Sequence, residues 1–363
     1  MNDFLAIQPQ LKSQKIQGRY ITHNAIESIV MQFPNKLIGT SVETRPIQAI
    51  DIGSGPVKVL MWSQMHGNES TATKALVDVL CYLQQNPAFL AAFTLKVIPI
   101  LNPDGAAAYT RVNANEVDLN RDAIEQSQPE SKLLVDLFHT FMPDYCFNLH
   151  DQRTIFGVHD NPCMLSFLSP AADETKKRTT AREKAMGVIG YIKNALQEHI
   201  PNQVGRYDDT FNPNCMGDFF TQQGTPTLLF EAGQVGQDYV RLETRKWYGY
   251  SILKALESIS LALYMPAIYQ EIPEVAKSFV DVLIKNISSG NRTVDIALQY
   301  VEVLKNDEII FVPILHKMGE LASLNGHKTV DVSGKNIRFS EELALGSNAL
   351  ELSKLLNLTQ YSH

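Results

Sequence analysis

Short apolar runs alternate with amphipathic stretches over the first three quarters of the chain. Apolar runs bounded by turn residues predict strands at residues 39–53, 57–64, 94–101, 144–150 and 225–233. Apolar residues at helical spacing predict helices at residues 23–33, 69–85, 130–143, 179–200 and 239–263. NPDG at residues 102–105 is expected to form a turn. Strands that alternate with helices in this way indicate an α/β layer fold.

The pattern changes near residue 272. From there on, runs with strand character are separated by Asn, Gly and Asp turns, which predicts strands at residues 278–287, 293–304, 308–315 and 328–334. A short terminal helix is expected at residues 347–358. We therefore expect two domains, residues 1–271 and a small β-rich module of residues 272–363. The module is expected to pack against the larger domain or against a second subunit in a homo-oligomer.

Composition and charge narrow the class of protein. The chain has 363 residues, of which 44% are hydrophobic and 20% charged, as in a globular enzyme. Its net charge of -7 argues against nucleic acid as the main partner, because a phosphate backbone favours clustered Lys and Arg. The N-terminal segment shows neither the basic start nor the apolar core of a secretory signal, and no apolar run is long enough to cross a membrane. A cytoplasmic location is the resulting expectation.

Residues of catalytic type follow four of the predicted strands. His66 and Glu69 follow the strand at 57–64, and His150 and Glu231 come at the ends of the strands at 144–150 and 225–233. The polar segment 102–122 follows the strand at 94–101. Ligands of open α/β sheets bind beyond the carboxyl ends of the strands. The polar residues that follow these four strands therefore predict one site at one edge of the sheet.

His66 and Glu69 are separated by three positions, and both are suitable zinc ligands. Taken alone, the pair is better explained as a polar helix start, with Glu69 near the positive helix end. His150 is the candidate third ligand, ahead of His139 in a helix and His159 in a loop. The four cysteines are scattered and form no CxxC pair, so a cysteine-based zinc site is not indicated.

The segment TRVNANEVDLNRD at residues 110–122 has no apolar periodicity and is rich in polar residues. Its arginines could bind a carboxylate in a bidentate manner and polarise a carbonyl. Asp118 could contact a metal-bound histidine, without binding the metal itself, and so orient its ring. Glu231 ends an apolar strand, a setting that suits a general base acting on metal-activated water.

These motifs resemble those of the zinc metallocarboxypeptidases of the carboxypeptidase A type. HGNE at 66–69 is similar to the zinc pair of that family, and NPDG with the segment 110–121 is similar to its substrate-binding loop. NLH at 148–150 resembles the strand with the third zinc ligand, and LLFEAG at 228–233 the strand with the catalytic glutamate. The resemblance covers roughly residues 20 to 265, with the motifs in family order.

The resemblance implies a mixed, mostly parallel central sheet flanked by helices, and one zinc ion per chain. Carried over to this sequence, it implies roles that are listed here in order: zinc binding by His66, Glu69 and His150; general-base catalysis by Glu231; oxyanion stabilisation by Arg111; binding of a terminal carboxylate by Asn120 and Arg121; and support of His66 by Asp118.

The sequence differs from the family pattern at several positions. Asn68 stands where many members have arginine, and Glu116 stands where they have glycine. Tyr207 is the nearest match to the family's capping tyrosine, displaced by a couple of positions. Gly217 falls on the specificity position and brings no charge, so a preference for basic C-terminal residues is not indicated.

The resulting hypothesis is a zinc-dependent carboxypeptidase that hydrolyses the C-terminal amide bond of a peptide or small amide with a free carboxylate. The main alternative is a related zinc amidohydrolase acting on cell-wall γ-D-glutamyl peptides or N-acyl amino acids. A zinc- or peptide-binding module without catalysis is a third reading, against which Glu231 counts. No nucleic acid or membrane partner is expected.

Overall fold

The computed structural model describes residues 3–289, 292–333, 345–350 and 352. The helices, with η marking 3-10 helices, are α1 (Phe4–Ile7), η1 (Gln8–Gln10), η2 (Lys12–Lys15), α2 (His23–Val30), α3 (Thr71–Gln85), η3 (Pro87–Ala92), α4 (Pro103–Ala108), η4 (Leu119–Arg121), α5 (Pro129–Phe141), α6 (Thr180–Leu196), α7 (Met216–Gln222), α8 (Leu242–Leu261) and α9 (Pro266–Glu271). The strands are β1 (Asn35–Thr40), β2 (Pro46–Ile52), β3 (Val57–Ser63), β4 (Phe93–Ile98), β5 (Tyr145–Asp151), β6 (Phe156–Val158), β7 (Asn161–Pro162), β8 (Leu165–Leu168), β9 (Val204–Arg206), β10 (Thr227–Ala232), β11 (Ala276–Lys277), β12 (Phe279–Ser289), β13 (Arg292–Lys305), β14 (Glu308–Gly319) and β15 (Asn325–Asp331).

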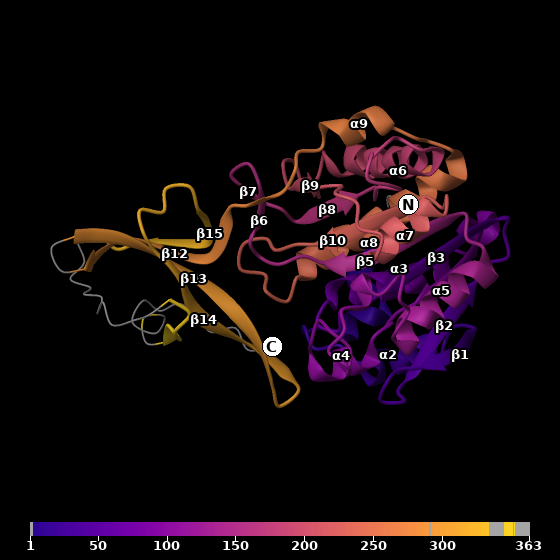
Figure 1. Cartoon of the computed structure of the whole chain (residues 1–363), viewed down its shortest axis with the longest axis horizontal. Helices are drawn as coiled ribbons and strands as arrows, with labels where there is room; N and C mark the ends of the chain where they lie inside the picture. The colour runs from indigo at the N-terminus through magenta and orange to yellow at the C-terminus, as the bar shows by residue number, and fades with distance from the viewer. Residues whose placement is uncertain (1–2, 290–291, 334–344, 351, 353–363) are drawn as a thin grey trace.

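An eight-stranded mixed sheet forms the centre of the larger part, in the order β1-β2-β4-β3-β5-β10-β8-β9. Its four middle strands, β4, β3, β5 and β10, run parallel, while β1, β2 and β8 join through antiparallel pairings. Helices lie on both faces (Figure 1). The expected mixed α/β fold with a mostly parallel centre is therefore confirmed.

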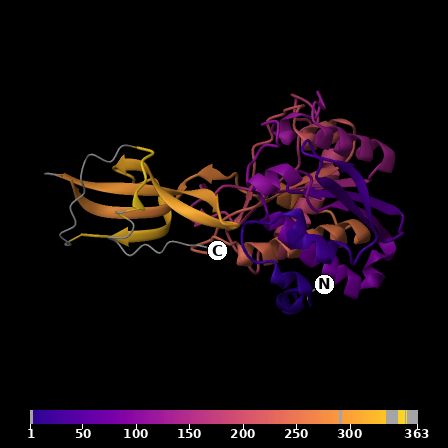
Figure 2. The same ribbon diagram turned by 90° about the horizontal axis from the view of Figure 1, so that it is seen from below.

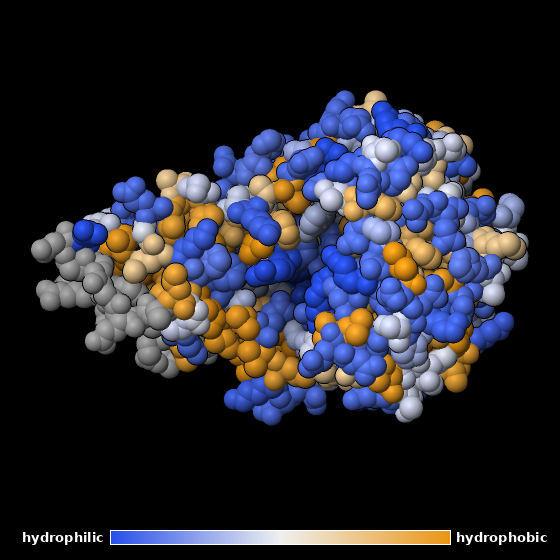
Figure 3. All heavy atoms as spheres, viewed as in Figure 1, coloured by the Kyte–Doolittle hydropathy of each residue, from blue (hydrophilic) through white to orange (hydrophobic). Residues whose placement is uncertain are grey.

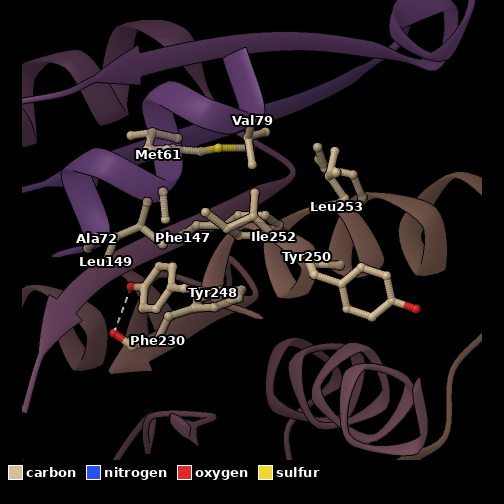
Figure 4. Packing of buried hydrophobic residues seen from close by; sticks show 14 of the residues in the cluster. Met61, Ala72, Val79, Phe147, Leu149, Phe230, Tyr248, Tyr250, Ile252 and Leu253 are labelled. Atoms are coloured by element: carbon tan, nitrogen blue, oxygen red, sulfur yellow. Dashed lines mark hydrogen bonds between the residues drawn. The ribbon is translucent and has the colours of Figure 1, made fainter. Parts of the chain in front are cut away.

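Alternation along the middle strands explains why helices cover both faces. On β3, Val59 and Met61 face one buried cluster, and Leu60 and Trp62 face the other, because successive side chains of a strand point to opposite sides. The first cluster includes residues of α3, α6 and α8, and the second includes residues of α5 and α7. Figure 4 shows the first cluster, with Met61 of the sheet beside Val79 of α3. Two-sided burial makes these strands nearly continuous apolar runs.

One local expectation was wrong. NPDG does not form a simple turn, because the short helix α4 begins at Pro103, directly after Asn102. The side chain of Asn102 accepts a hydrogen bond from the backbone N–H of Gly105 at 2.8 Å and so caps the helix. Proline at the first helical position and asparagine at the cap favour a helix start as well as a turn. The sequence NPDG therefore begins a helix in this chain.

The C-terminal strands form a separate four-stranded sheet in the order β14-β13-β12-β15, which projects from the larger part (Figures 1 and 2). Ile284, Ile296, Leu298 and Leu315 belong to its own buried cluster. The expected β-rich C-terminal region is confirmed, and the division into domains at residue 272 stays a prediction. The terminal helix expected at 347–358 falls mostly outside the described residues.

The C-terminal sheet is held to the larger part by apolar and polar contacts. Ile309 and Phe311 of β14 share a buried cluster with Tyr109 and Tyr239. In addition, β11, which precedes the C-terminal sheet, pairs with β6 of the larger part. Within the described residues, no helix combines the length and the apolar character that a membrane span requires.

Asp281 of β12 lies buried where the two parts meet. Its carboxylate accepts hydrogen bonds from the hydroxyl of Tyr239 at 3.0 Å and from the backbone N–H of Tyr300 at 2.7 Å. Gln299 also donates to Asp281, and its amide reaches Thr154 of the larger part at 2.6 Å. Burial raises the pKa of Asp281 to about 6, although these hydrogen bonds act in the opposite direction.

We expect Asp281 to make the stability of the fold depend on pH. An aspartate has a pKa of about 4 in the unfolded chain, so the folded protein binds more protons between about pH 4 and about pH 6. Stability is therefore lost as pH rises through this range, by up to roughly 3 kcal/mol. In Asp281→Asn, melting temperatures of metal-free protein between about pH 4.5 and about pH 7.5 should change less than in the parent. Equal pH dependence in both proteins would contradict this assignment.

Candidate metal centre

The loop between β3 and α3 carries His66 and Glu69. Its backbone lies directly against the start of α4, since a Cβ atom at Gly67 would come 1.9 Å from the carbonyl carbon of Gly105. The N–H of Asn68 donates to the carbonyl of Thr110 at 3.2 Å. Only glycine fits such a close approach between two backbones. The segment after β4 thus holds the HGNE loop in place.

His66, Glu69 and His150 are buried together at the carboxyl edge of the sheet. The two oxygens of Glu69 lie 2.8 Å from Nδ1 of His66 and 2.8 Å from Nδ1 of His150. The two Nδ1 atoms lie 3.1 Å apart. Ligands bound to a tetrahedral zinc ion at 2.0–2.2 Å are themselves about 3.3 Å apart. The three groups therefore have the spacing and the chemistry of a site for one zinc ion.

Neighbouring groups orient two of these three side chains, those of His66 and Glu69. Nε2 of His66 lies 3.0 Å from a carboxylate oxygen of Asp118, and the N–H of Asp151 donates to Glu69 at 3.1 Å. A carboxylate behind a histidine ligand fixes its tautomer and ring orientation. Although burial acts to raise it, the pKa of Glu69 is held well below its usual value by His66 and His150. Glu69 is accordingly ionised and held in a fixed orientation between the two histidines.

Glu69 does not cap the helix that follows it. The backbone N–H groups of Thr71 and Ala72, at the start of α3, donate to the carboxylate of Asp151 at 2.9 and 3.0 Å. The reading of His66 and Glu69 as a polar helix start is therefore wrong for Glu69. Asp151 takes that role from the neighbouring strand β5.

Glu231 lies beside the three ligands. It pairs in register with His150 across the parallel strands β10 and β5, which puts both side chains on the same face of the sheet. Its Oε2 atom is buried without a hydrogen-bond partner among the described residues. Burial and the negative charges of Glu69 and Asp151 raise the pKa of Glu231 well above its usual value. A carboxyl group with a raised pKa beside a metal site suits proton transfer.

The segment 110–122 contains residues of two kinds. Arg111 contacts the centre directly, with its guanidinium 3.3 Å from Glu69 and 3.0 Å from Asp118. Asn113 and Asp122 instead organise the loop: the Asn113 side chain accepts from Val117 N–H at 3.1 Å, and Asp122 accepts from backbone N–H groups before α5. The segment therefore brings only part of its polar residues to the metal centre.

A cavity of about 590 Å³ opens onto the centre. The other residues predicted to bind substrate line it: Asn120, Arg121, Tyr207 and Gly217. Arg121 donates to the carbonyl of Asn120 at 2.6 Å and lies 3.1 Å from Sγ of Cys215, and it pairs with no carboxylate among the described residues. Tyr207 reaches the same cavity despite its displaced position in the sequence, and its hydroxyl donates to Gln152 at 3.0 Å.

Several residues of this cavity were not anticipated from the sequence. Asp218 is one of them, and burial raises the pKa of its carboxyl to about 6. Gln152 and Arg153 also line the cavity, and they come directly after His150 and Asp151 at the end of β5. The rule that ligands bind beyond the carboxyl ends of strands could have identified them.

Comparison with known proteins agrees with this site. Residues 22–176 match the family model described as zinc carboxypeptidase. Carboxypeptidase 2 of Trichophyton tonsurans is 30% identical over 100 residues, which cover 26% of this chain and 19% of that protein. Carboxypeptidase SOL1 of Arabidopsis thaliana is 26% identical over 154 residues, with 34% of this chain and 31% of that protein covered. The matches thus span between about a fifth and a third of these curated relatives.

Solved structures share the fold. The metallo-carboxypeptidase from Burkholderia cenocepacia superposes with a TM-score of 0.53 at 19% identity, covering 66% of this chain and 68% of its own. A metallo-carboxypeptidase from Pseudomonas aeruginosa, solved with (2-guanidinoethylmercapto)succinic acid, gives 0.53 at 18% identity, again with 66% and 68% covered. This chain is thus similar to the zinc carboxypeptidases over residues 22–176 and to the metallo-carboxypeptidases in fold, and it contains a His-Glu-His cluster that fits a metal site.

Proposed function

We propose that this protein is a zinc-dependent hydrolase that cleaves the C-terminal amide bond of a peptide. The observation that carries the proposal is the buried His66–Glu69–His150 cluster with Glu231 in register beside His150. Three protein ligands and a neighbouring unpaired carboxyl group are the arrangement of a catalytic rather than a structural zinc site. When bound, zinc supplies Lewis-acid chemistry, polarising a carbonyl and making water more acidic.

The residues around the metal centre would have different roles in hydrolysis. Glu231 would take a proton from the attacking water and return it to the leaving amine, which suits a carboxyl group with a raised pKa. Arg111, fixed by Glu69 and Asp118, would stabilise the negative charge that develops on the carbonyl oxygen. Asn120 and Arg121 would bind the terminal carboxylate in the same cavity.

The remaining cavity residues bear on the choice of substrate. Gly217 leaves room beside Pro170 and brings no charge, which favours a neutral side chain in this part of the cavity. Tyr207, held by Gln152, would close over the bound residue. Burial raises the pKa of the Tyr207 hydroxyl, so it is neutral at physiological pH and can donate a hydrogen bond.

Metal analysis combined with a substrate screen tests the proposal. The purified protein should contain one zinc ion per chain and hydrolyse N-acylated L-dipeptides with neutral C-terminal residues. The screen should include γ-D-glutamyl peptides and N-acyl amino acids. Activity on those compounds alone would replace a peptidase with the related amidohydrolase, and a zinc-loaded protein inactive on every class would leave a binding module.

A further inference from the structure

A second cavity, of about 350 Å³, lies against the C-terminal sheet. Glu69 and Arg111 of the metal centre line one side of it, and four residues of β13 line the other: Gln299, Tyr300, Val301 and Glu302. Figure 3 shows hydrophilic residues around a hollow between the C-terminal sheet and the larger part. The C-terminal sheet therefore forms one wall of a space that reaches the metal ligands.

The two cavities meet along the segment that follows His150. Asp151, Gln152 and Arg153 line both of them. The groups proposed to bind the terminal carboxylate, Asn120 and Arg121, line only the first cavity. On the proposed function, the acyl side of the substrate would extend away from Asn120 and Arg121 and into the second cavity.

Arg153 differs from the other arginines of the second cavity. Arg19 pairs with Asp151 at 3.3 Å and with Glu302 at 3.4 Å, and Arg111 pairs with Glu69 and Asp118. Arg241 donates to the backbone carbonyls of Ala232 and Gln152 at 2.6 and 2.8 Å. Arg153 forms no hydrogen bond or ion pair with any described residue. Its guanidinium is free to bind a ligand.

The backbone around Arg153 is fixed on both sides. The Gln152 side chain donates to the carbonyl of Cys163 at 2.8 Å and accepts from Ser166 at 2.6 Å. On the other side, the carbonyl of Thr154 lies 2.8 Å from Nε2 of His327. The exposed guanidinium of Arg153 thus lies at the junction of the two cavities, on a backbone whose neighbours are held in place, where an anionic group could pair with it.

Two basic residues of β14, His316 and Lys317, lie near Arg153. Burial, Lys317 and Arg153 together lower the pKa of His316 on β14, which places these basic groups near one another. The carboxylates of the second cavity, by contrast, are each engaged by another arginine or by the metal ligands. An anionic ligand would therefore meet an uncompensated positive charge.

We infer that Arg153 is a specificity-determining residue that selects substrates with an anionic group on the acyl side of the scissile bond. That group would lie in the second cavity, closed by β13 of the C-terminal sheet. The inference rests on the proposed function for the direction in which the substrate lies. It assigns the C-terminal sheet a part in substrate choice.

The test compares two probes that differ in charge but not in shape: N-acetyl-L-glutamyl-L-leucine and N-acetyl-L-glutaminyl-L-leucine. Binding is measured by calorimetry on zinc-loaded Glu231→Gln protein, and hydrolysis is measured on the parent. We expect the glutamyl probe to bind about tenfold more tightly, since a hydrogen-bonded charge pair of this kind contributes on that order. Adding Arg153→Met should reduce the difference to about twofold or less, and Arg153→Glu should reverse it.

Arg178→Met is the matched control, because Arg178 is exposed and pairs with Glu183 away from both cavities. It should keep the full preference. Equal binding of both probes by the parent, or an unchanged preference in Arg153→Met, would overturn the inference, as would no binding of either probe. Preferential binding without hydrolysis would uphold the inference and reject the peptidase. Hydrolysis of both probes at equal rates would do the reverse.

Discussion

Replacing Glu231 by glutamine is expected to lower kcat by about 10²- to 10⁴-fold while leaving zinc bound, because a general base typically contributes on that scale. Glutamine keeps the shape of the side chain and cannot take up the proton. Glu231 does not belong to the three-residue cluster that would hold the metal. The variant should therefore contain one zinc ion per chain and bind peptides while failing to hydrolyse them.

The measurement is the rate of hydrolysis of an N-acylated dipeptide, together with zinc content. Glu257→Gln is a suitable control, since Glu257 pairs with Lys254 on α8 and lines neither the first nor the second cavity. It should retain the parent rate. A Glu231→Gln protein with more than about a tenth of the parent kcat would contradict a role for Glu231 in proton transfer.

Replacing His150 by alanine is expected to reduce bound zinc from one ion per chain to nearly none. The residue supplies one of three buried ligand atoms, and its loss leaves Glu69 without one of the two positive or metal-bound neighbours that keep it ionised. Zinc bound at about 1,000 times its dissociation constant stabilises a fold by roughly 4 kcal/mol. Chelation should accordingly lower the melting temperature of the parent and leave that of His150→Ala unchanged.

His139 provides the matched control for this experiment. It is the competing histidine of α5, and its ring nitrogen lies 2.9 Å from Gln223 on the surface, away from the metal centre. His139→Ala should bind zinc as the parent does. Full zinc content in His150→Ala, or a melting temperature of the parent that does not respond to chelation, would contradict the assigned ligands.

The positions of the metal-binding residues could be predicted because the local pattern already contains them. Val59 to Trp62 form a continuous apolar run, and such a run predicts a strand buried on both faces. Parallel strands in one sheet have their carboxyl ends at the same edge, so His66, His150 and Glu231 had to come close together. The roles of these residues, the cytoplasmic location and the oligomeric state stay predictions.

The sequence was ambiguous where a local motif is compatible with two different local structures. Asn102 and Pro103 suit both a turn and a helix start, and in the structure they begin α4, whose Gly105 packs against Gly67. Glu69 likewise suited a helix end or a metal. The first N–H groups of α3 donate to Asp151 of β5, a strand that is distant in the sequence. Glu69 is therefore not needed as a helix cap and instead contacts the two histidines.

The sequence by itself determined the layered fold, the edge of the sheet at which the candidate site lies, and the identity of the residues there. It could do so because strand and helix periodicity are local properties. Only the tertiary structure decided what surrounds that edge. The wall formed by β13, and the pairing that leaves Arg153 without a carboxylate, depend on contacts such as Arg19 with Glu302, which are far apart in the chain. Periodicity within one segment carries no information about which distant segment will supply its partner.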